Sequence, residues 1–262
     1  MKELRRALRP GGSADEGVVA IEGPNLLDEA MRARLRIRCV FAAQGAEHLL
    51  EGMRLPADIE LLLMPRELLS SALATETPKP VAALIEPPQW TWADLLPDSP
   101  RQDPLLVVLC GLQDPGNLGT ILRSAEAFGA NGVISLPGTV SAWNQKSVRA
   151  SAGSVFRVPQ LRMNATDCFA RLQQAGIQAL ASKAHEAQSL SNSQLTRPVA
   201  LLIGNEGSGL SADLESRADG TIMIPCPGPV ESLNAAVAAS VLLYESARQR
   251  GLASRRGSME AR

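Results

Sequence analysis

The 262-residue sequence lacks a long hydrophobic segment, an excess of charge of either sign and clustered cysteines. No apolar run approaches the length of a membrane span, and the first residues, MKELRRALRPGG, are charged where a signal peptide needs an apolar core. The cysteines form no CxxC pair, which excludes the usual zinc-binding spacings and favours buried thiols in a reducing compartment. They are Cys39, Cys110, Cys168 and Cys226. We therefore expect a soluble, cytoplasmic protein.

Charge and histidine content narrow the range of functions further. The net charge is -1, so no global basic field marks the chain as a nucleic-acid-binding protein, and any such contact needs a local patch. The two histidines, His48 and His185, lie outside every motif described below. We expect both at the surface.

Hydrophobic patterns divide the chain into two α/β domains. Strand-like and helix-like segments alternate over residues 13–86, which predicts a small sheet covered by helices. Residues 87–104 are rich in proline and acid and form the predicted linker. Residues 105–250 begin with a continuous apolar run and predict an open, mostly parallel sheet with helices on both sides. We expect residues 1–12 to be a mobile basic arm and residues 251–262 a disordered tail.

The first segment that points to chemistry is DPGNLGTILRSAEAFG, residues 114–129. Asn117 is placed to cap the helix that follows, and Arg123 projects from the side opposite an apolar stripe. The stripe comprises Leu118, Ile121, Ala125 and Phe128. A cation near the carboxyl end of a sheet suits an anionic group such as a phosphate. A solvated surface arginine is the alternative.

The second segment is LLIGNEGSGL, residues 201–210, a glycine-rich loop directly after a buried strand. Such a loop brings backbone close to a ligand in α/β proteins. Its glycine spacing matches neither the dinucleotide fingerprint nor a Walker loop, and the Glu206 carboxylate argues against a phosphate ligand. A plain turn with an exposed Glu206 is the alternative.

The third segment, GTIMIPCPGPVESLNAAVAASVLLY, covers residues 220–244. It predicts a short strand, a loop stiffened by three prolines and a long alanine-rich helix with Ser232 as its N-cap. We interpret the loop as half of a ligand pocket. An ordinary strand–loop–helix is the alternative.

Together, these segments resemble the signatures of the SpoU (TrmH-type) RNA 2′-O-ribose methyltransferase family of the SPOUT superfamily. That family carries an Asn-x-Gly-x-x-x-Arg segment running to Phe-Gly, a Gly-x-Glu-Gly-x-Gly loop and an Ile-Pro-x-x-Gly-x-x-x-Ser-Leu-Asn helix start. The matching residues are Asn117, Gly119, Arg123, Phe128 and Gly129; Gly204, Glu206, Gly207 and Gly209; and Ile224, Pro225, Gly228, Ser232, Leu233 and Asn234. Cys226 stands where relatives often carry Met, which we interpret as a packing change.

The resemblance covers residues 105–250 closely and implies the fold. The second domain would be an α/β knot, a deep trefoil in which the carboxyl-terminal segment threads a loop, and periodicity alone could never indicate this. The first domain is similar, more loosely, to the family's L30e-like substrate-binding domain, through the segment EGPNLLDEA at residues 22–30.

The resemblance also implies S-adenosylmethionine as cofactor, with no metal. By carry-over, the backbone at Gly204, Ile224 and Leu233, with Pro225 in the same loop, would hold the cofactor. The reaction would be displacement at the sulfonium methyl by a ribose 2′-hydroxyl.

The family's catalytic residues carry over as well. Arg123 is its proposed activating residue, but a guanidinium is a poor base, so we assign Arg123 to the phosphate next to the target ribose. Asn117, Ser232 and Asn234 would orient the nucleophile and the loops, and Glu206 would anchor them through backbone hydrogen bonds.

RNA and a second copy of the chain are the expected partners. RNA contact requires local positive charge, and the candidates are Arg32, Arg34, Arg36, Arg38, Lys146, Arg149 and the arm residues Arg5, Arg6 and Arg9. Alternate spacing places the first four on one side if that stretch is extended, and a solvated helix end is the alternative. The L30e-like first domain favours ribosomal RNA over transfer RNA, by analogy. Relatives are homodimers with the active site at the interface, which we expect here.

Three other functions remain open at this point. The chain could methylate a base, although the Arg123 and Ser-Leu-Asn set speaks against it. It could be a non-catalytic RNA-binding assembly factor, which the complete motif set disfavours. A nucleotide-phosphate enzyme is undermined by the absent phosphate-loop lysine.

Overall fold

The computed structural model describes Leu4 and residues 17–53, 55–56, 59–73, 75, 77–99 and 102–251. The predicted arm, apart from Leu4, and the predicted tail after Gly251 lie outside the described residues. The chain forms two compact units, residues 1–89 with 141–157 and residues 90–140 with 158–262. Within the described part of the chain, no helix is long and apolar enough to cross a membrane.

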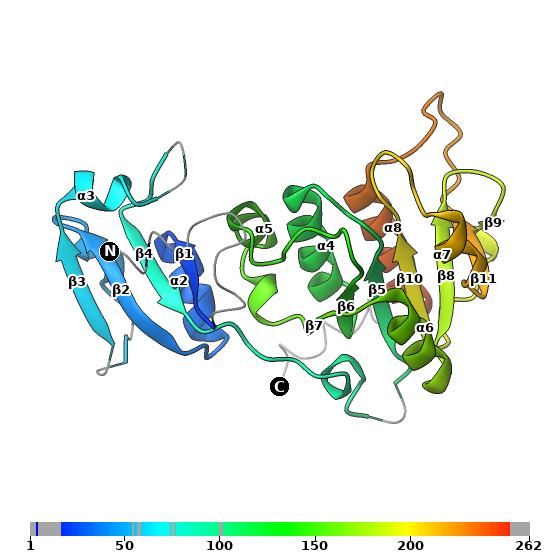
Figure 1. The fold of residues 1–262 in the computed structure, drawn as a ribbon, viewed down its shortest axis with the longest axis horizontal. Coiled ribbons are helices and arrows are strands. Elements are labelled where there is room, and N and C mark those ends of the chain that lie inside the picture. Colours follow the sequence, from blue (N-terminus) through cyan, green and yellow to red (C-terminus); the bar gives the residue numbers. More distant parts are fainter. Residues whose placement is uncertain are drawn as a thin grey trace. The chain divides into compact units, whose positions relative to one another are not determined.

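The first unit is built on a four-stranded sheet (Figure 1). Its strands, in spatial order, are β1 (Val19–Glu22), β4 (Val81–Ile85), β2 (Ile37–Ala43) and β3 (Glu60–Met64). β4 runs antiparallel to both neighbours, whereas β2 and β3 are parallel. Helices α2 (Pro24–Arg32) and α3 (Arg66–Ser70) complete this α/β unit. The helix-like segment at residues 46–53 forms only the 3-10 turn η1 (Glu47–Leu50), because Gly45 and Gly52, both at positive φ, bracket it.

Residues 141–157 make their contacts within the first unit. They contain helix α5 (Gln145–Ser151) and the 3-10 turn η3 (Ser154–Phe156). The Gln145 side chain donates to the Ala20 carbonyl at 2.8 Å, and Arg157 lies 2.6 Å from the Glu29 carboxylate. Ala152 and Gly153 adopt left-handed conformations and turn the chain between α5 and η3. This segment was predicted within the second domain and instead packs with the first unit.

The second unit is built on a seven-stranded sheet in which every pair of neighbours is parallel. Its spatial order is β7 (Gln160–Arg162), β6 (Gly132–Ser135), β5 (Leu105–Leu109), β10 (Val199–Ile203), β8 (Gln178–Lys183), β11 (Gly220–Met223) and β9 (Gln188–Ser189). Its helices are α4 (Pro115–Ala127), α6 (Ala165–Gln174), α7 (Ala212–Ser216) and α8 (Ala235–Gln249). β5 and β10 are buried throughout, which confirms the predicted two-sided burial. The 3-10 turns η2 (Ala93–Leu95) and η4 (Leu190–Asn192) lie outside the sheet.

The order of these strands differs from their order in the sequence. β10 lies between β5 and β8, and β11 lies on the other side of β8. Loops after adjacent parallel strands meet at one edge of a sheet. The loops at residues 110–114, 204–210 and 224–234 follow β5, β10 and β11, and they lead into or belong to the three segments singled out by sequence.

Helices α4 and α8 pack against each other (Figure 1). The Ser124 and Ser240 hydroxyl oxygens lie 2.7 Å apart, and the rings of Phe128 and Tyr244 meet edge to face at 5.8 Å. The predicted stripe on α4 is confirmed for Leu118, Ile121 and Ala125, which are at most 1% exposed.

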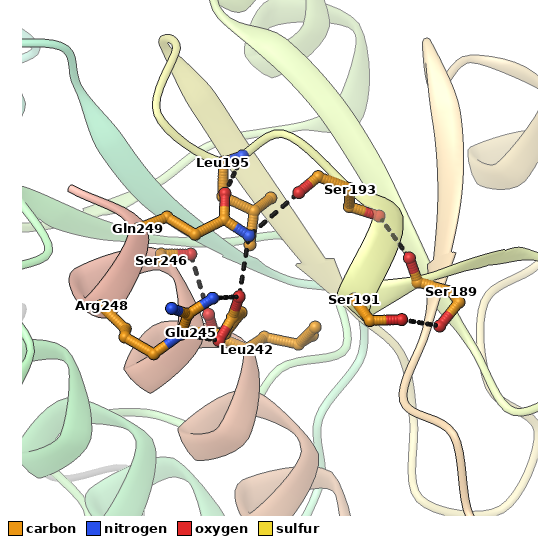
Figure 2. Close-up of polar contacts among 9 residues, drawn as sticks. All are labelled: Ser189, Ser191, Ser193, Leu195, Leu242, Glu245, Ser246, Arg248 and Gln249. Carbon is orange, nitrogen blue, oxygen red and sulfur yellow. Dashed lines mark hydrogen bonds and ion pairs between the residues drawn. The ribbon is translucent and has the colours of Figure 1, made fainter.

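The carboxyl end of α8 is held by polar side chains (Figure 2). Gln249 accepts from the Leu195 N–H at 2.8 Å and donates to the Ser193 carbonyl at 3.0 Å and to Glu245 at 2.8 Å. The adjacent Arg250 guanidinium donates to the backbone carbonyls of Asp103, Pro104, Leu195 and Arg197. One end of α8 is thus fixed to the segments that lead into β5 and β10. The trefoil threading itself stays a prediction.

The four cysteines are free, but they are not all buried as predicted. Cys110 and Cys168 lie in the core of the second unit, where burial raises the pKa of each thiol to about 12. Cys39 is half-buried and Cys226 is exposed. The residues of the proline-rich loop that carries Cys226 are exposed or half-buried, and only residues on either side of this loop belong to the core.

Candidate functional site

Glu206 connects the glycine-rich loop after β10 to the start of α4. Its Oε1 accepts from the Asp114 N–H and from the Asn117 side-chain amide, both at 3.0 Å, and its Oε2 accepts from the Gln113 N–H at 3.2 Å. Burial raises the pKa of Glu206, but hydrogen bonds from Asn117 and then from backbone N–H groups outweigh it and hold the pKa below 4.5. Glu206 is therefore an anion at neutral pH.

Asn117 extends this connection to the last helix. Its Oδ1 accepts from the Asn234 side-chain amide at 3.1 Å, and Asn234 Oδ1 accepts from the Ala236 and Val237 N–H groups at 2.9 and 3.3 Å. Hydrogen bonds thus run from Glu206 through Asn117 and Asn234 into α8. One member of each sequence segment takes part.

Both predicted helix caps are wrong by a few residues. Asp114, not Asn117, caps α4, because its carboxylate accepts from the Gly116 and Asn117 N–H groups and Pro115 occupies the first helical position. Asn234, not Ser232, caps α8, which begins at Ala235. Neither Asn117 nor Ser232 therefore caps a helix. The side-chain amide of Asn117 instead forms hydrogen bonds with residues of the other two segments.

Asn205 is a residue whose role sequence reasoning missed. Its Nδ2 donates to the Gly111 carbonyl at 2.8 Å, and its Oδ1 accepts from the Gly207 N–H at 2.8 Å. Its backbone pairs with Gly209 through two hydrogen bonds of 2.9 Å. This closure brings backbone so near that a Cβ at Gly204 would lie 2.4 Å from the Gly209 carbonyl carbon. Asn followed by two spaced glycines is a turn signal that could have identified it.

A cavity of about 330 Å³ lies at the carboxyl ends of β8, β10 and β11. Its walls combine the backbone of residues 204–209 with aliphatic side chains. The aliphatic residues include Ile203, Ile222, Ile224, Leu233 and Leu242. Ala235 and Ala238 of α8 add two small side chains. Such a wall suits a flat, neutral ring system recognised by backbone groups.

Comparison with known proteins places this arrangement in a family. The model of the SpoU rRNA Methylase family matches residues 104–244. The chain belongs to the SpoU family. The resemblance drawn from the three segments is thereby confirmed, and with it the α/β fold with a mostly parallel sheet.

SpoU relatives match most of the chain. The 23S rRNA (guanosine(2553)-2′-O)-methyltransferase RlmP of Bacillus subtilis is 30% identical over 228 residues, covering 86% of this chain and 86% of that protein. An uncharacterized tRNA/rRNA methyltransferase of Synechocystis is 33% identical and covers 98% of this chain and 93% of its own length.

Solved SpoU structures share the fold over nearly the whole chain. The methyltransferase AviRb of Streptomyces viridochromogenes, in complex with the cofactor AdoMet, is 30% identical with a TM-score of 0.81, covering 95% of this chain and 97% of that one. A structure described as an RNA 2′-O ribose methyltransferase has a TM-score of 0.79 at 30% identity and covers 95% of both chains.

The SpoU signature residues occupy different positions around the cavity. Gly204, Glu206, Ile224, Ser232 and Leu233 line it. Pro225 lies between two lining residues, Ile224 and Cys226, without lining the cavity itself. Cys226 also lines the cavity, and its interpretation as a packing change stays a prediction. Asn117 and Asn234 do not line the cavity. Their side chains are hydrogen-bonded to each other, and Asn117 is hydrogen-bonded to Glu206, which does line it.

Arg123 lies apart from the cavity. It is exposed on α4, opposite the buried stripe, as predicted from helical spacing, and its side chain makes no hydrogen bond or ion pair with a described residue. Its guanidinium is therefore available to a group that approaches from outside the unit.

The predicted RNA-binding residues that the structure describes belong to the first unit, and Arg5, Arg6 and Arg9 lie outside the described residues. Arg32 ends α2, where it pairs with Asp28 at 2.9 Å, and Arg34 adopts a left-handed turn at φ 56, so the stretch is not extended throughout and the one-sided spacing fails for these two. Arg36 lies 3.6 Å and Arg38 2.9 Å from the same Glu86 carboxylate. Lys146 and Arg149 are exposed on α5, and both histidines are exposed as predicted.

Proposed function

We propose that this protein transfers a methyl group from S-adenosylmethionine to a ribose 2′-hydroxyl of RNA, with ribosomal RNA as the substrate. The observation that carries the proposal is the cavity at the ends of three adjacent parallel strands, supported by the Glu206–Asn117–Asn234 hydrogen bonds. A 2′-O-methyltransferase of 23S rRNA among the relatives and AdoMet in a solved relative support the same chemistry.

The cavity fits the cofactor in size and in chemistry. A volume of about 330 Å³ falls within the roughly 300–1,000 Å³ usual for small-molecule sites. Gly204, Ile224 and Leu233 offer backbone groups beside aliphatic walls, and Pro225 stiffens the loop between them. Bound there, S-adenosylmethionine would supply an electrophilic methyl group on a sulfonium.

The protein's own groups position the RNA and the loops. Hydrogen bonds among Asn117, Asn234 and Glu206 hold the glycine-rich loop, α4 and α8 in one arrangement. Ser232 lies on the cavity wall, and its hydroxyl does not cap a helix. Placing two reactants at attack distance can contribute roughly 7–11 kcal/mol to the barrier reduction. We assign Arg123 to the phosphate beside the target ribose, where a positive charge stabilises the developing alkoxide.

A homodimer is part of the proposal. Val237 and Tyr244 on the outer side of α8 are 49% and 50% exposed, and Tyr244 meets Phe128 of α4. These two side chains give the helix an apolar face that suits contact with another protein surface. A second copy of the chain is the occupant that we propose, and sedimentation velocity of the purified protein would contradict it by finding only monomers.

The decisive experiment maps 2′-O-methyl groups in total RNA from cells with and without the gene. We expect one ribosomal nucleotide to lose its methyl group and to regain it when purified protein and S-adenosylmethionine are added. Loss of a base methyl group, or of a transfer-RNA ribose methyl group, would overturn the substrate assignment. Unchanged RNA, together with absent cofactor binding, would favour a non-catalytic assembly factor.

A further inference from the structure

Three charged side chains line the cofactor cavity among the residues that the structure describes, namely Lys183, Glu206 and Glu231. They come from the end of β8, from the loop after β10 and from the loop before α8. The partners of each side chain differ, and those partners decide which charge a ligand in the cavity meets.

Lys183 is already paired. Its Nζ lies 2.7 Å from Oε1 of Glu215, a residue of α7 that does not line the cavity. Both side chains are about one-third exposed, at 29% and 34%. The positive charge of Lys183 is therefore largely balanced from outside the cavity.

Glu206 is also committed. Its two oxygens accept three hydrogen bonds, from Gln113, Asp114 and Asn117. These donors fix the carboxylate toward α4 and offset its charge with N–H dipoles.

Glu231 differs from both. It is exposed on the cavity wall and makes no hydrogen bond or ion pair with any described residue. Glu231 follows the proline-rich part of the loop and lines the cavity next to Ser232, so its charge lies at the cavity wall without a partner among the described residues. Of the three charges, that of Glu231 is the one a ligand meets unbalanced.

We infer that Glu231 makes the cavity prefer the sulfonium-bearing methyl donor over its demethylated product. The inference rests on the proposed function. S-adenosylmethionine carries one positive charge more than S-adenosylhomocysteine, and the two share every other group. An unbalanced carboxylate attracts that additional charge, whereas contacts with the shared adenosine and amino-acid parts leave the ratio of the two affinities unchanged. Glu231 thus favours exchange of product for fresh donor after each turnover.

The expected effect is modest because Glu231 is exposed to solvent. Exposed charge pairs change an affinity by about two- to fivefold at low salt. Glu231→Gln should therefore lower the affinity for S-adenosylmethionine by that factor and leave the affinity for S-adenosylhomocysteine unchanged. The difference should shrink at high ionic strength.

Isothermal titration of both ligands against the full chain tests the inference. Lys183→Gln serves as the opposite variant, because it removes the cation and leaves the Glu215 carboxylate, so the preference for the sulfonium should rise. Asp213→Asn is the matched control, an acid of α7 in the same unit that does not line the cavity. Its affinity ratio should equal that of the unmodified protein.

Equal losses for both ligands in Glu231→Gln would overturn the inference, because Glu231 would then contact a shared group. An unchanged ratio would overturn it too, including the case in which only the methylation rate falls and Glu231 acts as a base. If the unmodified protein binds neither ligand, the proposed function fails instead. Thermal melting of each variant separates loss of folding from loss of selectivity.

Discussion

In each unit a glutamate at or just after the end of a strand binds a segment distant in sequence, but the two glutamates are arranged differently. Glu22 ends β1, is 5% exposed, and accepts at Oε1 from the Thr75 hydroxyl and the Lys79 N–H, both at 2.7 Å. Its buried Oε2 has no hydrogen-bond partner among the described residues. Glu206 is exposed, and both its oxygens accept hydrogen bonds.

This difference separates a structural anchor from a residue that aligns a site. The two hydrogen bonds of Glu22 hold Thr75 and Lys79 in place, and its second, unpartnered oxygen destabilises the folded state. Glu206 instead joins two loops and a helix at the rim of a cavity. Glu22 therefore has a structural role inside the first unit, whereas Glu206 aligns segments around the cavity of the second unit.

The largest expected effect comes from the second unit. Arg123→Ala removes an exposed charge without removing a packing contact, so methylation should slow by about 100-fold or more through lost transition-state stabilisation. The affinity for S-adenosylmethionine should not change. Single-turnover methylation of a ribosomal RNA fragment and calorimetry give the two readouts. Arg217→Ala, an exposed arginine of the same unit, is the control. Lost cofactor binding in Arg123→Ala would contradict the phosphate role.

Glu206→Ala should come next. Three hydrogen bonds to a carboxylate disappear, and the loop at residues 204–209 loses its connection to α4. We expect cofactor affinity to fall by about tenfold, with little change in the free energy of unfolding, since the residue is exposed. Calorimetry and urea unfolding measure the two quantities. If the free energy of cofactor binding and the free energy of unfolding fell by the same amount, Glu206 would be a structural anchor like Glu22.

Lowering the pH should reproduce part of this loss of cofactor affinity in the unmodified protein. Hydrogen bonds hold the folded-state pKa of Glu206 below its ordinary value, so its contribution is fully present above the unfolded-state pKa and is lost as pH falls through the folded pKa. Cofactor affinity should therefore decline in this acid range in the unmodified protein. Glu206→Ala should lack the Glu206-dependent part of the decline, and an identical decline in both would exclude Glu206 as its source.

Glu22→Ala should have the reverse signature. It leaves the Thr75 hydroxyl and the Lys79 N–H without an acceptor, which should lower the free energy of unfolding by about 1–3 kcal/mol. Hydrogen exchange in β1 and β4 locates the change, and Glu67→Ala, an exposed acid on α3, is the control. Reduced cofactor affinity in a folded Glu22→Ala protein would remove the distinction between the two glutamates.

The smallest expected effect is on RNA affinity. Arg149→Ala removes one exposed cation of α5 and should weaken RNA binding by a few-fold, with a salt dependence reduced by about one counterion. Methylation at saturating RNA should be unchanged. Filter binding across a salt series measures this, and an unaltered slope would exclude Arg149 from the phosphate contacts.

The sequence predicts the residues of the candidate site best at positions where the surrounding structure allows few residue types. Gly204 leaves no space for a Cβ against Gly209, and Glu206 needs donors that only the turn at Asp114 and Asn117 supplies. Those restrictions produce a recognisable pattern. No such restriction acts on Arg149, whose exposed side chain many residue types could replace, so charge alone suggested it.

Helix caps show the limit of local reasoning. Ser232 and Asn234 are both good capping residues, as are Asp114 and Asn117, and propensity does not choose between two candidates so close together. The choice fell to Asn234 and Asp114 because Asn117 is engaged by Glu206 and Asn234 on neighbouring elements. A contact across 89 or 117 residues of sequence is invisible to a window of a few residues.

The sequence by itself determined the buried strands, the helices and the three motif segments, because burial periodicity and backbone restrictions act over a few residues. Tertiary structure alone decided that β10 inserts between β5 and β8, that residues 141–157 pack with the first unit, and that Glu231 stands unpaired on the cavity wall. These outcomes depend on which distant segments share water-excluded surface and hydrogen-bond donors, and that competition is settled only when the whole chain packs.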